Sequence, residues 1–316
     1  MPEPISPCTI NHHTPHPMKT IVSTAKILSG VIAFCAQAHA ALILDETFSD
    51  NNLTNQALPD SAAWYLVHGN NNGVDHTIAA NNGTLKATIT TRNTGNPGII
   101  AYFSEPGTPI RLQNVGDSIT VSFSLTTSSN TFPGGGWGDA LRFGLYDSNG
   151  NRLTENKNTW ALTSGAFASS SGYTVRGAVG NYADGSVTIQ RRTTGNDDLF
   201  SSGTNVGSTG YVTGTLNYAT TYDFSLSLSR TVNGIAYSFT YGAITLTGED
   251  ATPATWEFDT FALGFLSNAY RDNSVFILDN VRIESSSIPE PASVALLLGF
   301  LVMVPALRFL RIHGRR

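Results

Sequence analysis

The strongest constraint on the fold is a period-two alternation of apolar and small polar residues in the middle of the chain. Residues 119–125 read Ile-Thr-Val-Ser-Phe-Ser-Leu, and residues 224–229 read Phe-Ser-Leu-Ser-Leu-Ser. Successive side chains of a β-strand point to opposite faces, so these segments are predicted to be half-buried strands. No helical period of ten residues or more occurs outside the two ends of the chain.

Asn-Gly pairs lie between such runs at Asn82-Gly83, Asn149-Gly150 and Asn233-Gly234. Both residue types tolerate the positive φ of tight hairpin turns, so residues 141–146 and 225–241 are expected in antiparallel hairpins. Many short strands separated by turns are typical of sandwiches and jelly rolls. We therefore predict an all-β fold, an antiparallel β-sandwich of jelly-roll type.

The first 40 residues have the three parts of a secretory signal. A start with Lys19 and Lys26 precedes the apolar run 27–35, and small residues follow it. This order predicts a signal helix that is removed after export. The expected cleavage falls between Ala40 and Ala41, after the Ala38-His39-Ala40 sequence. Residues 1–17 are proline-rich and contain no Lys or Arg, so Met18 is the expected true start.

The other end of the chain carries an apolar run bounded by arginine. A short Ser-rich linker, 285–288, precedes Pro289-Glu290-Pro291 and the uncharged run 292–307. A transmembrane helix at about 292–310 is expected, with the main domain outside the cytoplasm, because Arg lies only beyond the C-terminal end of the run. The arginines concerned are Arg308, Arg311, Arg315 and Arg316.

Residues 289–316 resemble the PEP-CTERM sorting signal of Gram-negative bacteria. The likeness rests on Pro289-Glu290-Pro291, the hydrophobic helix and the terminal Arg cluster. It implies recognition by an exosortase, an integral-membrane enzyme with a cysteine nucleophile, after export by the general secretion machinery. It also implies anchoring in the membrane before processing, and a final place at the cell surface or in the extracellular matrix.

Residues 41–288, between the two signals, have a composition of their own. They hold 12 basic against 21 acidic residues, a net charge of −9, whereas the whole chain has −5. This acidity argues against a nucleic-acid partner. Both cysteines, Cys8 and Cys35, precede Ala41. A disulfide framework, a thiolate metal site and a Cys nucleophile are therefore excluded from the domain predicted at 41–284.

The domain opens with residues 42–50 and closes with the apolar segment 275–283. These edges resemble concanavalin A-like and carbohydrate-binding jelly rolls, whose first and last strands lie near each other. Asp279 is in phase with the apolar residues at 275, 277, 281 and 283, so this carboxylate would point inward if they face the core. A buried carboxylate needs a partner. Structural Ca²⁺ held by Asp45, Glu46 and Asp279 would supply one.

The alternative arrangement of the closing segment turns its other face to the core. Phe276 and Leu278 would then be buried, and Asp279 would cap a turn or pair with an Arg. The alternation alone leaves both arrangements open.

No catalytic constellation is found in the sequence. The E-x-D-x-x-E run of laminarinase-like glycosidases is missing, and the nearest carboxylates are Glu249-Asp250 and the pair Glu257 and Asp259. Nucleophile-elbow, zinc-protease and phosphate-loop motifs are also missing, so no enzymatic activity is predicted.

A binding role has better candidates. Trp137, with Asp139 nearby, follows three glycines, so its indole is expected in a loop where it could stack on a sugar ring. Core packing is the alternative for this residue. The predicted function is an exported, non-catalytic β-sandwich with a structural or binding role, for which extracellular polysaccharide is a candidate partner. A calcium-containing lectin-like module and a divergent polysaccharide hydrolase or lyase are the alternatives.

Overall fold

The computed structural model describes most of the central part of the chain. The described residues are 40–67, 76–90, 97–127, 137–157, 167–179, 185–195, 199–200, 203–207, 210–212, 216, 219–265 and 273–286. They all belong to one compact unit, Ala38–Ile288. Within these ranges there is no helix, and all pairs of named strands are antiparallel. The predicted all-β antiparallel fold is confirmed.

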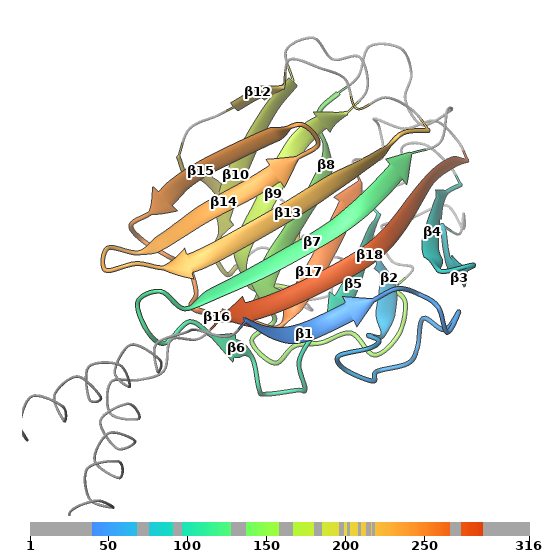
Figure 1. The fold of residues 1–316 in the computed structure, drawn as a ribbon, viewed down its shortest axis with the longest axis horizontal. Coiled ribbons are helices and arrows are strands. Elements are labelled where there is room, and N and C mark those ends of the chain that lie inside the picture. The colour runs from blue at the N-terminus through green and yellow to red at the C-terminus, as the bar shows by residue number, and fades with distance from the viewer. Residues whose placement is uncertain are drawn as a thin grey trace, which may run out of the picture. The chain divides into compact units, whose positions relative to one another are not determined.

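Eight strands form the first sheet, called sheet 1, which faces the viewer in Figure 1. Across it lie β15 (Ile244–Asp250), β14 (Ile235–Tyr241), β13 (Thr221–Arg230), β7 (Ser118–Thr127), β18 (Ser274–Ser286), β4 (Thr84–Ile89) and β3 (Thr77–Asn81). The eighth strand, β1 (Ala40–Glu46), pairs with β18 beyond the end of β4. The first and last strands of the unit are thus neighbours, as the resemblance to carbohydrate-binding jelly rolls implies.

The second sheet, sheet 2, also has eight strands. Its order is β11 (Thr204–Asn205), β10 (Gly185–Arg192), β9 (Ser171–Val179), β8 (Trp137–Asp147), β17 (Thr260–Phe265), β5 (Gly98–Tyr102) and β2 (Trp64–Val67), with β12 (Gly210–Val212) also paired to β10. A separate two-stranded ladder joins β16 (Glu257–Phe258) to β6 (Ile110–Arg111).

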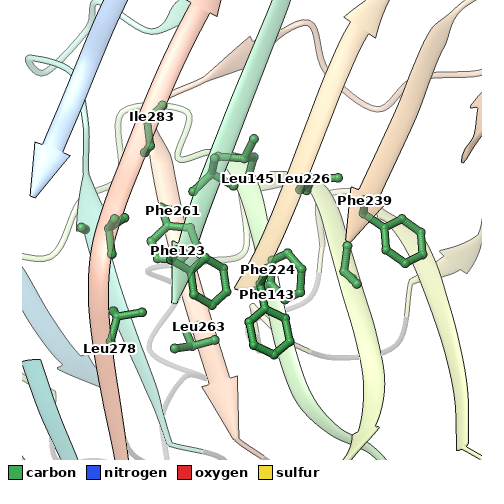
Figure 2. Packing of buried hydrophobic residues seen from close by; sticks show 14 of the residues in the cluster. Phe123, Phe143, Leu145, Phe224, Leu226, Phe239, Phe261, Leu263, Leu278 and Ile283 are labelled. Carbon is green, nitrogen blue, oxygen red and sulfur yellow. The ribbon is translucent and has the colours of Figure 1, made fainter. Parts of the chain in front are cut away.

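Aromatic and aliphatic side chains from both sheets fill the space between them (Figure 2). Phe123 of β7 lies 5.1 Å from Phe143 of β8, between ring centroids, and stacks on Phe224 of β13 at 5.2 Å. Along β7 every second side chain is buried, as the alternation predicts. Apolar surface removed from water is the main stabilising term for such a core. The two sheets therefore form a β-sandwich.

The three Asn-Gly pairs have different roles. Asn82 and Gly83 have φ of 51° and 77° and connect β3 directly to β4, as predicted. Asn149 and Gly150 also have positive φ, but their turn leads into a longer connection before β9, so the predicted two-residue hairpin is wrong there.

Gly234 is the last residue of the turn that connects β13 to β14. Neither Gly234 nor Asn233 has positive φ. Glycine is needed here for space, because a Cβ at Gly234 would lie 2.1 Å from the carbonyl oxygen of Asp250. The hairpin is confirmed, but the steric reason differs from the predicted one.

A β-bulge decides which face of β18 is buried. Phe276 and Leu278 point into the core, and after the bulge Val281 and Ile283 do so as well. Asn280, with φ of 52°, is the extra residue that shifts the alternation. Asp279 does not point inward with Val281 and Ile283, so the first of the two predicted arrangements is wrong. β18 also includes Ser285 and Ser286, so the prediction that these two residues belong to a linker is wrong.

The predicted signal helix lies outside the described residues, as does the predicted transmembrane helix at about 292–310. Among the residues that are described, no helix is long and apolar enough to cross a membrane.

Candidate functional site

Glu46, one of the three predicted calcium ligands, is buried among donors from the protein itself. It is 2% exposed, and its carboxylate accepts hydrogen bonds from the amides of Phe48 at 2.8 Å and Ala62 at 3.0 Å. The Ser61 hydroxyl and the Trp64 indole nitrogen also donate to it, both at 3.3 Å. A buried carboxylate needs such partners. Glu46 therefore holds the connection between β1 and β2 in place.

The other two predicted calcium ligands have separate partners. Asp45 lies 3.7 Å from the guanidinium of Arg282, its register neighbour on β18. Asp279 accepts a hydrogen bond of 2.7 Å from the amide of Asn280, within the bulge. In the part of the chain that the structure describes, no three His, Cys, Asp or Glu residues are grouped to hold a metal. The structure does not bring the predicted ligands together as a calcium site.

Two of the four carboxylates considered for catalysis, Asp250 and Asp259, are buried in ion pairs. Asp250 is buried, lies 2.8 Å from Arg191 and accepts the hydroxyl proton of Tyr173 at 2.9 Å. Burial, together with the negative charge of Asp250, raises the pKa of Tyr173. Asp259 is also buried and pairs with Arg152 at 2.9 Å. Neither arrangement is the pair of carboxylates on one strand that retaining glycosidases use.

Trp137 and Asp139 lie in β8, which begins at Trp137. The expected loop position of Trp137 is wrong, because its backbone pairs with Val179 of β9. Their side chains lie outside the described part of the structure, so the sugar-stacking prediction stays a prediction. Among the other aromatic residues, Trp64 is buried in the core.

The sorting and cleavage residues fall mostly outside the described ranges. Pro289, Glu290, Pro291, Arg308, Arg311, Arg315, Arg316 and Ala38 all do so. Ala40 and Ala41 lie in β1, where they pair with Ser286 and Ser285 of β18. The predicted cleavage point thus falls at the start of a paired strand.

A set of polar side chains lies on the face of sheet 2 that points away from the core. In β8, β9 and β10 the core residues alternate with outward residues, which include Arg142, Arg176 and Gln190. We call this set the polar patch; its members are Arg142, Thr174, Arg176, Thr188, Gln190 and Arg192.

Strand register brings the members of the polar patch together. Arg142 of β8 is the direct partner of Arg176 of β9, which is in turn opposite Thr188 of β10. Thr174 and Gln190 form the next pair along the same strands. Opposite residues in a ladder have their Cβ atoms about 4.5–5.5 Å apart. Two guanidinium side chains therefore start side by side from the same face.

The arginines of the polar patch are buried, each less than a tenth exposed, and hydrogen bonds to oxygen atoms help to hold them in place. Arg142 donates to the carbonyl oxygen of Phe200, and Arg176 donates to the side-chain oxygen of Gln190 at 2.8 Å. Gln190 in turn donates to Asn205 at 2.7 Å. Arg192 donates to the carbonyl of Phe167 at 2.6 Å.

The neighbouring part of the same face is apolar, and like most of the polar patch it is buried. The Phe200 ring packs directly on two glycines of sheet 2, Gly98 and Gly264. A Cβ atom added at these positions would lie only 2.4 and 2.8 Å from the ring, so no larger residue fits there. Ile100, Tyr146 and Leu199 belong to the same buried cluster. The Phe200 side chain thus covers β5 and β17, while its carbonyl oxygen meets the edge of the polar patch at Arg142.

The polar patch is not among the sites predicted from the sequence. A partial signal exists, because Arg142 and Thr188 occupy the polar positions of alternating segments. Alternation alone does not tell which strands are neighbours, so it could not place these residues together.

Guanidinium and carboxamide groups at fixed positions suit the recognition of sugar hydroxyl and carboxylate groups. A guanidinium is planar and presents several donors in a fork, which matches the oxygens of such ligands.

No family model matches the chain, and no curated protein matches it. Among solved structures, the carbohydrate recognition domain of Emp46p in its metal-free form is 11% identical, with 77% of this chain and 94% of that chain covered and a TM-score of 0.46. A basic winged bean lectin with Tn-antigen is also 11% identical, over 80% of this chain and all of its own, with a TM-score of 0.43. A mutant of the alginate lyase Aly36B in complex with alginate trisaccharide is 14% identical over 70% of this chain and 97% of its own, with a TM-score of 0.37.

Proposed function

We propose that this chain is an exported protein of the cell surface or extracellular matrix whose β-sandwich is a non-catalytic carbohydrate-binding module. The observation that carries the binding part is the polar patch, where Arg142, Arg176 and Gln190 come from three adjacent strands to one face. Sites on regular strands hold their side chains in fixed positions. A polysaccharide offers many oxygens that such side chains can bind.

Two buried carboxylates among the catalytic candidates support a role without catalysis. Asp250 and Asp259 are buried and engaged with Arg191 and Arg152. A glycosidase needs one carboxyl group as an acid and a second as a nucleophile or base, both facing the substrate. Asp250 and Asp259 are buried in ion pairs with arginine, so they are poorly placed to act as the acid and the nucleophile of a glycosidase.

The sorting part of the proposal rests on the two ends of the sequence. The export signal precedes Ala41, and Pro289-Glu290-Pro291 follows β18, whose last residue is Ser286. The proposed partners are the general secretion machinery and an exosortase. The proposed route is export, anchoring through the C-terminal helix, and processing at Pro289-Glu290-Pro291.

Binding is tested with the full-length chain in a neutral detergent on an array of neutral and acidic polysaccharides. We expect retention on at least one polysaccharide, and at least fivefold weaker retention for Gln190→Ala, which removes a side chain of the polar patch. Gln113→Ala is the control for a glutamine outside the patch, because Gln113 is exposed in the connection between β6 and β7. Thermal unfolding of both variants shows that they are folded. No retention by the wild type, or an equal loss in the control, contradicts the proposal.

Sorting is tested by following the mass and the location of the protein in its own cells. Glu290→Ala is expected to leave the precursor unprocessed in the membrane. The control is Glu284→Ala in β18, which should be processed normally because it lies before the motif. Normal processing of the Glu290→Ala chain would remove the exosortase from the proposal.

A further inference from the structure

We propose that the end of the sandwich at which β18 leads into the sorting signal is a membrane-docking surface, with Val115 and Val232 as its apolar tips. Its occupant is the lipid surface of the bilayer that anchors the precursor. The inference rests on the proposed anchoring through the C-terminal helix and adds how the sandwich meets that bilayer. We call this surface the membrane-proximal end; it comprises the turns 113–117 and 231–234 and the paired ends of β1 and β18.

Strand pairing brings these segments together at the left-hand end of sheet 1 in Figure 1. Ser286, the last residue of β18, is opposite Ser118, the first residue of β7, which is in turn opposite Ser229 of β13. Beyond this row the amide of Gly116 donates to the carbonyl oxygen of Arg230 at 2.8 Å. The two turns therefore lie side by side, and β13 is only two strand spacings, or about 10 Å, from β18.

Exposed apolar side chains gather at the membrane-proximal end. Among the described residues four large hydrophobic side chains are exposed, and Val232, at 82%, and Val115, at 51%, are the most exposed of them. Leu42, at 38%, is at the same end, because it lies in β1 opposite Glu284. Ile277 lies in the other half of β18, which pairs with β4. Isolated exposed apolar residues are common on proteins, whereas a group at one end indicates contact with another surface.

Both valines occupy turns that otherwise consist of typical turn residues. The two sequences are Asn114-Val115-Gly116 and Val232-Asn233-Gly234. Asn and Gly suit tight turns through the backbone conformations that they tolerate, whereas a β-branched residue has no such advantage. Burial of the two valine side chains in lipid would remove apolar surface from water, which is favourable.

Hydrogen bonds hold both turns in shape. The buried carboxylate of Asp117 accepts the amides of Gln113 and Asn114 at 2.9 and 2.7 Å. In the other turn the hydroxyl of Thr231 accepts the amide of Gly234 at 2.9 Å, and the Thr231 amide donates to the Gly234 carbonyl oxygen at 2.7 Å. Neither of these two described turns has an exposed charged side chain. The tips can therefore enter the lipid headgroup region without desolvating a charge.

A short connection keeps the membrane-proximal end close to the bilayer in the anchored precursor. Residues 287–291 connect Ser286 to the predicted membrane span, which begins at residue 292. When fully extended, this connection covers about 20 Å at most, because an extended chain advances by no more than ~3.6 Å per residue. Tethering gives the tips a high effective concentration at the lipid surface, so a weak apolar contact is sufficient for docking.

Lipid contact is tested with the full-length chain in vesicles of neutral phosphatidylcholine, with and without bromine on the acyl chains. A fluorescent probe is attached to Asn233→Cys, an exposed position beside Val232, after the two cysteines of the chain are replaced by serine. Brominated lipid is expected to quench this probe about twofold or more, because the tip lies in the interface. A probe on Ile277→Cys, in the other half of β18, is the control and should be quenched by less than about a tenth.

Matched variants with the probe at Asn233→Cys test the valines themselves. Val115→Asp combined with Val232→Asp should reduce the quenching to the level of the control probe, since a carboxylate is costly to desolvate. Ile277→Asp should leave the quenching unchanged. Thermal unfolding shows that the variants are folded.

Flotation of the vesicles separates the inference from the anchoring on which it rests. A chain that floats with the vesicles but shows no quenching at the tip overturns the inference and leaves the anchoring intact. That result is also expected if a membrane protein, and not lipid, covers the tips. Unchanged quenching in the double variant overturns the role of the two valines. A chain that does not float with the vesicles overturns the proposed anchoring and the inference together.

Discussion

The carboxylate of Glu46 organises the connection between β1 and β2. It accepts hydrogen bonds from four donors, among them the amides of Phe48 and Ala62. Phe48 has φ of 53°, a conformation that is unusual for a bulky residue. The hydrogen bond from its amide supports this backbone geometry. A residue that looks like a metal ligand in the sequence thus has a structural role in the fold.

We expect Glu46→Ala to lower the free energy of unfolding by about 2–4 kcal/mol, because the substitution leaves several buried donors without an acceptor. Urea denaturation followed by tryptophan fluorescence measures the loss. Asp45→Ala, at the half-exposed neighbouring position, should change the free energy of unfolding by less than about 1 kcal/mol. Similar losses in the two variants would contradict the role given to Glu46.

Asp147 provides a test at the residue scale that depends on pH. Burial raises its pKa above the ordinary value of 3.8, and the charges of Asp259 and Glu257 act in the same direction, against the hydrogen bond from the amide of Asn149. A raised pKa in the folded state means that the charged form destabilises the fold. This cost is full above the folded pKa and disappears below the unfolded one.

Asp147→Asn should therefore raise the free energy of unfolding at pH 7, by less than about 1 kcal/mol because the group is partly exposed. The gain should shrink as the pH falls through the folded pKa toward 3.8. Urea denaturation at pH 7, 5 and 3.5 measures it, with the exposed Asp60→Asn as the control. A gain that grows toward low pH would contradict the sign derived for Asp147.

At the scale of elements, the bulge lies where β18 changes its pairing partner along one edge, from β4 to β1. Residues 274–278 pair with β4, and residues 281–286 pair with β1. The extra residue, Asn280, lies between the two ladders and shifts the alternation by one. Leu278 and Val281 can both be buried only because of this shift.

Asn280→Gly should leave the free energy of unfolding within about 0.5 kcal/mol of the wild type, because glycine adopts positive φ readily. Asn280→Val should lower it by about 1–2 kcal/mol, since a β-branched residue is strained at that φ. Thermal unfolding of the two variants compares them directly. Equal midpoints would show that the backbone at this position does not require positive φ.

At the scale of the whole molecule, the two ends of the sandwich are tied together. β1 lies along the edge of β18, with Ala41 opposite Ser285 and Glu46 opposite Val281. The core includes Leu44 from β1 and Ile283 from β18. Deletion of residues 1–46 removes this ladder, a core side chain and the carboxylate of Glu46 together.

We expect the chain that starts at Thr47 to lose its cooperative unfolding transition, whereas the chain that starts at Ala41 should keep it. The reason is the sum of the lost core burial, the unsatisfied donors and the exposed edge of β18. Near-ultraviolet circular dichroism in increasing urea measures the transition. A cooperative transition at an unchanged midpoint in the shorter chain would show that β1 is dispensable.

The fold could be predicted from sequence further than the site could. The segment 119–125 predicts a strand correctly because its alternation is a local property. The Asn82-Gly83 turn is correct for the same reason, since positive φ is set by the two residues themselves. The orientation of Asp279 and the connection after Asn149-Gly150 could not be predicted in this way. The bulge and the long connection depend on partners that are distant in the sequence.

The sequence by itself determined the strands, the all-β class and the absence of thiols from the main domain, because these follow from residue type and spacing along the chain. Only the tertiary structure decided that Arg142 meets Arg176 and that Glu46 meets Trp64. The physical reason is register. Hydrogen bonding between strands and burial of one face in the core fix which residues become neighbours, and both depend on segments far apart in the sequence.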